Sequence, residues 1–208
     1  MPLTDLPNEI LQTIANNLET ESQTNRFLLT SREIYSRLND WFYKRNIRQG
    51  SWGLFDAAYN GALDTAKRFL RLGADANAKG SHSNFSIVRT VLGAAVWSQH
   101  HDIAKLLLAY AADPNDRDTQ GRTPLFYAAQ LGNGPIVKLL LQWGADVNVY
   151  DFGSVPLSPL DVAFSAQDQS PEVVALLLEG GVDPDIVEGS LKAAPSWSES
   201  SGEEYDED

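Results

Sequence analysis

The stretch that decides the fold is GRTPLFYAAQLGN at residues 121–133, continued by IVKLLLQWGADVN at residues 136–148. Thr123 is suited to cap a helix, and Pro124 suits a first helical turn, where a missing N–H costs nothing. Gly144 is suited to end a second helix in the left-handed region, which glycine enters at little cost. The stretch therefore predicts a hairpin of two short helices. Their apolar positions are Leu125, Ile136, Val137, Leu139 and Leu140.

Three further segments repeat this pattern. Their matching aspartates, Asp75, Asp113, Asp146 and Asp183, are 38, 33 and 37 residues apart, so two loops carry insertions. The second copy has Ala111 where the others have glycine, at an expected cost of up to about 1 kcal/mol if the left-handed geometry is kept. We place the copies at about 50–79, 80–117, 118–150 and 151–187, within a repeat region of 50–194 that ends in a short cap.

The quoted stretch resembles the ankyrin repeat, whose period is about 33 residues. The resemblance implies an all-α solenoid of four helix-turn-helix repeats with hairpin loops, in which stacking supplies the core. Ankyrin families bind target proteins through loop tips and first helices, and Trp97 ranks first here because exposed aromatics are enriched in binding hot spots. The alternative is that Trp97 packs against the loop from Gly80 to Arg89. The matching target-binding positions are Trp97, Tyr59, Asn60, Arg89, Arg122, Gln130 and Leu131, with Ser154, Val155, Leu157 and Ser165 in the fourth copy.

Residues 1–49 follow a different pattern. The segment LPNEILQTIANNL at 6–18 places apolar residues on one face of a helix opened by Pro7. A second short helix is expected at about 22–29. A third begins after Ser31, where Thr30 and Glu33 have the spacing of a capping box.

Three short helices with a leading Leu-Pro-x-Glu-Ile-Leu resemble the F-box, and the combination with repeats resembles fungal F-box/ankyrin-repeat proteins. The resemblance implies a Skp-family adaptor as partner, bound through Leu6, Pro7, Ile10, Leu11 and Ile14. The chain would then be the substrate-recognition subunit of a Skp–cullin–F-box ubiquitin ligase, with its ankyrin face on the target. In the alternative, the N-terminal helices are only a cap, and the chain is an ankyrin scaffold or regulator such as a transcription coregulator.

The net charge, the composition and the local motifs disfavour several other classes of function. The net charge is -12, which disfavours direct binding of nucleic acid. The acidic segment 195–208 is expected to be disordered.

The chain has no cysteine, no signal-peptide pattern at its start and no apolar run of membrane-spanning length, so we expect a cytoplasmic or nuclear protein with no membrane partner. His100, His101 and Asp102 form a cluster, but adjacent histidines at a helix start diverge, so we expect a structural role. We therefore expect no enzyme, catalytic site, metal or cofactor.

Overall fold

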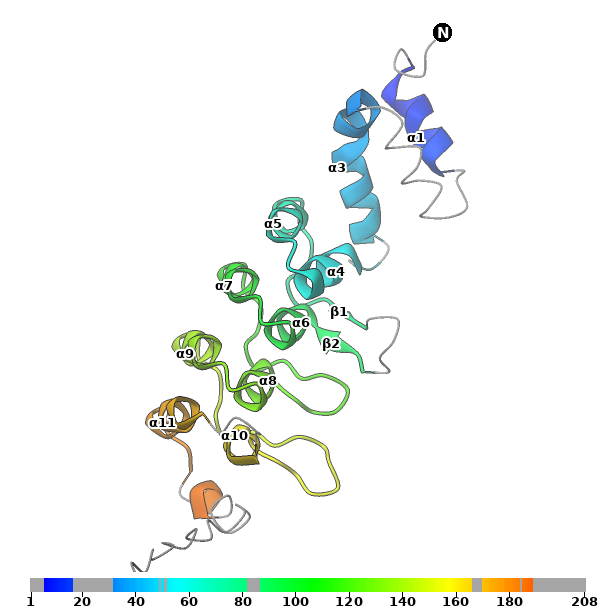
Figure 1. Cartoon of the computed structure of the whole chain (residues 1–208). Coiled ribbons are helices and arrows are strands. Elements are labelled where there is room, and N and C mark those ends of the chain that lie inside the picture. The colour runs from blue at the N-terminus through cyan, green and yellow to red at the C-terminus, as the bar shows by residue number, and fades with distance from the viewer. Residues whose placement is uncertain are drawn as a thin grey trace, which may run out of the picture. The chain divides into compact units, whose positions relative to one another are not determined.

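The computed structural model describes residues 6–16, 32–48, 50, 52–81, 87–165, 170–183 and 185–188, and these residues are mostly helical. The chain divides into two compact units, residues 1–112 and 113–208. The helices of the first unit are α1 (Asn8–Asn16), α3 (Arg32–Arg48), α4 (Trp52–Asn60), α5 (Leu63–Arg71), α6 (Val91–Trp97) and α7 (His101–Ala109) (Figure 1). Two short antiparallel strands, β1 (Lys79–Gly80) and β2 (Arg89–Thr90), precede α6. The helices of the second unit are α8 (Pro124–Gln130), α9 (Gly134–Gln142), α10 (Pro159–Ser165) and α11 (Pro171–Glu179).

Side-chain caps fix where helices α6, α8 and α10 begin. The Thr123 hydroxyl accepts a hydrogen bond from the Phe126 N–H at 3.3 Å, and Pro124 lies in the first turn of α8, as predicted. Thr90 caps α6 in the same way. Before α10, Ser158 and Asp161 cap each other's backbone N–H groups, at 2.7 and 3.2 Å.

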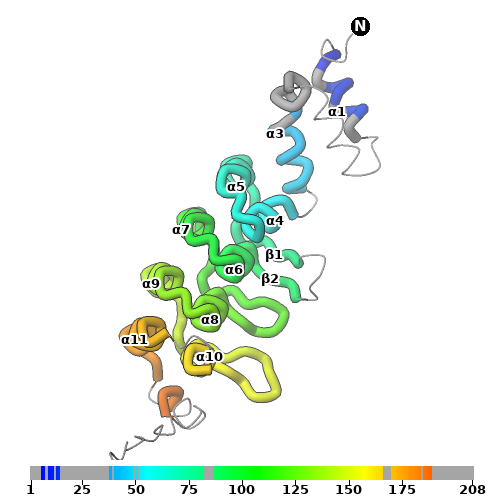
Figure 2. The backbone as a smooth tube through the Cα atoms, viewed as in Figure 1, coloured from blue at the N-terminus to red at the C-terminus, as the bar shows by residue number. Residues whose placement is uncertain are grey.

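Each unit builds its core by laying helix pairs side by side. In the second unit α8 packs against α10 and α9 against α11 (Figure 2). Ala128 and Ala129 are fully buried, and their small side chains let α8 and α10 approach closely. The predicted apolar stripe is confirmed, since Leu125, Ile136, Val137, Leu139 and Leu140 are all buried. In the first unit α4 packs against α6 and α5 against α7.

Asparagine side chains connect the loops of neighbouring pairs inside each unit. Asn115 donates to the Gly144 carbonyl at 3.0 Å and accepts from the Asp146 N–H at 2.7 Å. Asn148 makes the same two bonds with Gly181 and Asp183. In the first unit Asn77 donates to the Ala111 carbonyl at 3.2 Å. The repeated aspartates fix these asparagines in turn, because the Asp75, Asp113 and Asp146 carboxylates accept the backbone N–H groups of Asn77, Asn115 and Asn148.

Helix α1 packs against α3, and α3 packs against α4 and α5 of the first helix pair. Leu11 of α1 and Leu38 of α3 are fully buried together, with Leu6 and Phe42 against them. At the other end of α3, the Asn46 side chain accepts the Gly53 N–H at 2.9 Å. The helix predicted at 22–29 lies outside the described residues. These helices share the compact unit of α4–α7, so the boundary predicted at residue 49 stays a prediction.

In the described parts of the chain, no helix combines the length and apolar character needed to cross a bilayer.

The second residue after the second helix of each pair adopts a left-handed backbone conformation. Gly73, Gly144 and Gly181 have φ of +90°, +81° and +88°. Ala111 occupies the same position with φ of +62°, so the geometry is kept despite its Cβ. This left-handed φ is the basis for expecting local strain at Ala111.

We predict that Ala111→Gly raises the free energy of unfolding by up to about 1 kcal/mol, because glycine removes the left-handed strain. Urea denaturation measures this difference. Ala109→Gly is the matched control, since the same change in the last turn of α7 should lower stability, by up to about 1 kcal/mol. A loss of stability in Ala111→Gly would contradict the strain argument.

Candidate protein-binding surfaces

The residue ranked first for target binding, Trp97, is half-buried in the first unit. The Arg89 guanidinium lies 4.8 Å from the centre of its ring, which is a cation–π distance. Arg89 itself is 3% exposed. A guanidinium buried to this extent is not available to a partner, so the prediction for Arg89 is at odds with the structure. Trp97 thus packs against the end of the 80–89 segment, which is the alternative considered for it.

Tyr59 and Asn60 end helix α4. The Tyr59 carbonyl lies 3.2 Å from Nε2 of His100, and Tyr59 is half-buried. Asn60 is exposed, but its amide donates back to the carbonyl and side chain of Asp56. The His100 ring packs so closely on Gly61 that a Cβ there would lie 2.6 Å from it. These contacts agree with the structural role expected for His100. Within the described ranges, no group of three or more His, Asp or Glu residues is arranged to hold a metal ion.

Arg122, Gln130 and Leu131 belong to the second unit. Nε of Arg122 lies 3.5 Å from the buried Asp151 carboxylate, and its guanidinium lies 5.2 Å from the Phe126 ring centre. Arg122 therefore joins two loops of its own unit. Gln130 is exposed and Leu131 half-buried at the end of α8, so both remain available to a partner.

A more exposed apolar feature lies in the loop between α9 and α10. Phe152 is 69% and Val155 74% exposed, and these are the largest exposures among the big apolar side chains that the structure describes. Leu157 beside them is also exposed. We call these three residues the loop tip. Val155 and Leu157 were predicted as binding positions from the repeat pattern, whereas Phe152 was not. The uncharged run FGSVPLSPL at 152–160 is the sequence feature that could have indicated an exposed apolar loop.

The loop tip is held in place by hydrogen bonds at its base. The Asp151 carboxylate, 7% exposed, accepts from the N–H groups of Gly153 and Leu157 at 3.3 and 3.0 Å. The Phe152 N–H donates to the Gln120 carbonyl at 2.8 Å, and the Arg117 guanidinium lies 5.6 Å from the Phe152 ring centre. An ordered apolar tip loses little entropy when a partner covers it.

The residues predicted to bind an adaptor differ in exposure and fall into three groups. Pro7 and Ile10 are exposed, Ile10 at 47%, and Leu6 and Ile14 are half-buried. Leu11 is fully buried against Leu38 and is therefore a core residue here, contrary to its predicted contact role. The surface that α1 offers to a partner is thus centred on Pro7 and Ile10.

Comparisons with known proteins place the repeats in a family. A family model described as "Ankyrin repeats (3 copies)" matches residues 54–151. The chain is 34% identical over 141 residues to Neurogenic locus notch homolog protein 2 of Homo sapiens, covering 67% of this chain and 5% of that protein. It is 44% identical over 73 residues to Transient receptor potential channel pyrexia of Drosophila melanogaster, covering 35% of this chain and 7% of the channel. It is 35% identical over 94 residues to Putative ankyrin repeat protein FPV014 of Fowlpox virus (strain NVSL), covering 44% of this chain and 20% of that protein.

The similarity between this chain and these relatives lies in the ankyrin repeats. The chain spans no more than a fifth of the length of these relatives. The matched residues begin at Leu54, so α1 and α3 lie outside them, as do α10 and α11. Residues 54–151 of this chain are ankyrin repeats, and such repeats form a protein–protein interaction module.

Proposed function

We propose that the chain is the substrate-recognition subunit of a Skp–cullin–F-box ubiquitin ligase. In this proposal α1 binds the Skp-family adaptor, and the ankyrin repeats, with α10 and α11 as a fourth repeat, bind the protein to be ubiquitinated. The observation that carries the proposal is the solvent exposure of Pro7, just before α1, and of Ile10 on α1, at the positions that match the F-box pattern. The ligation chemistry belongs to other subunits.

The target is proposed to bind at the loop tip. Aromatic side chains are enriched in hot spots, and Phe152 is exposed at a rigid position. Gln130 and Leu131 at the end of α8 belong to the same unit and extend the candidate surface. The loop tip carries no charge, so its partner surface is expected to be an apolar pocket.

A second function is favoured by the packing of the N-terminal helices. Leu11 points into a core with Leu38, and Asn46 of α3 bonds to the first residues of α4. This arrangement suits a cap that covers the open face of the first repeat. In that case the chain is a scaffold or regulator, such as a transcription coregulator, with no adaptor.

The adaptor hypothesis predicts that Ile10→Asp abolishes binding of a purified Skp-family adaptor in a pull-down. A buried carboxylate in an apolar interface is strongly unfavourable. The thermal transition of the repeats should hardly move, because Ile10 is already exposed.

Thr13→Asp is the control, because it adds the same charge to an exposed position of the same helix. It should keep the adaptor bound. If the unaltered chain never binds the adaptor but still retains its target, the scaffold function replaces the ligase function.

The target hypothesis predicts that the double variant Phe152→Ser, Val155→Ser recovers the target about tenfold less efficiently, as expected for loss of a hot spot. Affinity purification of the tagged full chain with quantitative mass spectrometry measures the recovery. Trp143→Ser is the control, since Trp143 is 46% exposed at the end of α9. Equal recovery by both variants would exclude the loop tip as the target site.

A further inference from the structure

The basic residues of this acidic chain are concentrated in one region. Residues 32–71 contain eight of the 16 basic side chains and only four acidic ones, a net charge of +4 in a chain of -12. Helix α5 alone carries Lys67, Arg68 and Arg71. The other described helices from α4 to α11 carry just Lys105 and Lys138. The distribution therefore gives the α3–α5 region a local positive field.

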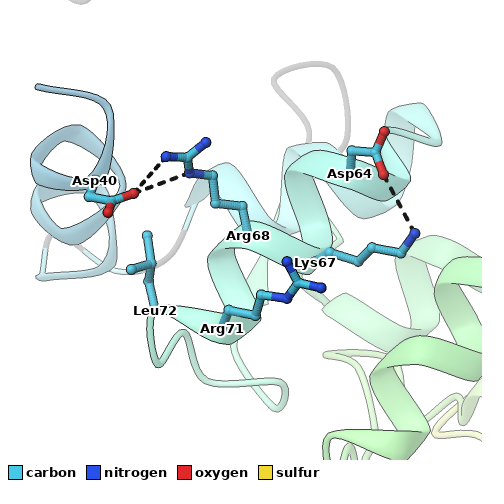
Figure 3. Close-up of a pocket in the computed structure, with 6 residues that line it drawn as sticks. All are labelled: Asp40, Asp64, Lys67, Arg68, Arg71 and Leu72. Atoms are coloured by element: carbon cyan, nitrogen blue, oxygen red, sulfur yellow. Dashed lines mark hydrogen bonds and ion pairs between the residues drawn. The ribbon is translucent and has the colours of Figure 1, made fainter. Parts of the chain in front are cut away.

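A groove lies on this region, between α3 and α5. Its volume is about 490 Å³, and it is lined by Asp40, Asp64, Lys67, Arg68, Arg71 and Leu72 (Figure 3). Arg68 reaches across the groove to Asp40, with Nε and Nη2 donating to one carboxylate oxygen at 3.2 and 2.7 Å. The Arg68 guanidinium also lies 5.3 Å from the Tyr43 ring centre, so it is held from two sides. Leu72 adds an apolar side chain to the lining.

The ion pairs of the groove leave its positive charge accessible. Asp64 pairs with Lys67 at 3.5 Å, but the Asp64 side chain is 98% exposed, and such surface pairs contribute little. Arg71 is exposed and makes no ion pair with any residue that the structure describes. Lys67 and Arg71 are one turn apart on α5, so they present two cations to the same ligand.

We propose that this groove binds an acidic peptide segment of a partner protein. Lys67 and Arg71 would pair with its carboxylates, while Leu72 contacts an apolar residue between them. A nucleic acid fits less well, because its phosphates continue beyond the groove and the rest of the chain carries a net charge of -16. The site does not depend on the adaptor or the loop tip, and it adds a second kind of partner recognition.

Fluorescence polarisation of the full chain with the fluorescein-labelled peptide Glu-Glu-Leu-Glu-Glu-Leu-Glu-Glu tests the proposal. Binding is expected at about 50 mM salt and should weaken strongly at about 300 mM, because these charges are exposed. Lys67→Glu and Arg71→Glu should each weaken binding by about fivefold or more, since each replaces an attraction by a repulsion. The same peptide with glutamine in place of glutamate should not bind.

Lys138→Glu on α9 is the control, because it changes the total charge equally at an exposed position outside the groove. It should change the affinity by less than about twofold. Equal weakening by Lys138→Glu, or no binding of the acidic peptide, would overturn the proposal. Tighter binding of a single-stranded oligonucleotide, lost in Arg71→Glu, would assign the groove to nucleic acid instead.

Discussion

The structure depends on the fact that a pair of short helices cannot bury its apolar face alone. Helix α8 has seven residues and α9 has nine, so the pair is too small to cover its own apolar side chains. Leu125, Val137 and Leu140 are buried because other helices pack over them. Within the second unit α10 and α11 supply that cover. Stability is thus shared between neighbouring pairs, as expected for repeat proteins. Because the core is formed by the helices, the loops do not contribute to it. The loop tip can therefore expose apolar side chains without destabilising the fold.

Much of the fold was predictable because the repeat pattern encodes local geometry. Thr123 and Pro124 begin a helix as predicted, and Gly144 follows the second helix of the same pair in the left-handed region. Ala111 keeps the left-handed conformation although it has a Cβ, so the conformation at this position does not require glycine. The spacing of the aspartates also identified the loops, where Asn115 and Asn148 then join successive pairs by hydrogen bonds. Asp185 stands at the matching position of the fourth copy, and its carboxylate has no N–H to donate to a neighbouring carbonyl.

The binding surfaces were predicted less well, because exposure depends on contacts between residues distant in the sequence. Arg89 follows a loop but turns inward against Trp97. Leu11 matches the F-box pattern but packs on Leu38. Periodicity identifies the apolar face of a helix, but it does not say which residues of that face lie in the core and which lie in an interface. Phe152 was not predicted, because its exposure depends on the hydrogen bonds that the Asp151 carboxylate accepts from the loop backbone. The groove beside α5 likewise requires α3 to lie next to it, which no local pattern indicates.

Hydrogen exchange after a change in one helix tests the sharing of the core most directly. Leu160 of α10 is fully buried, and Leu160→Ala should lower stability by about 2–5 kcal/mol. If neighbouring pairs stabilise one another, amide exchange should accelerate in α8 and α9 as well as in α10 and α11. Val155→Ala, at an exposed position, should leave all four helices unchanged. Faster exchange confined to α10 and α11 would contradict the account.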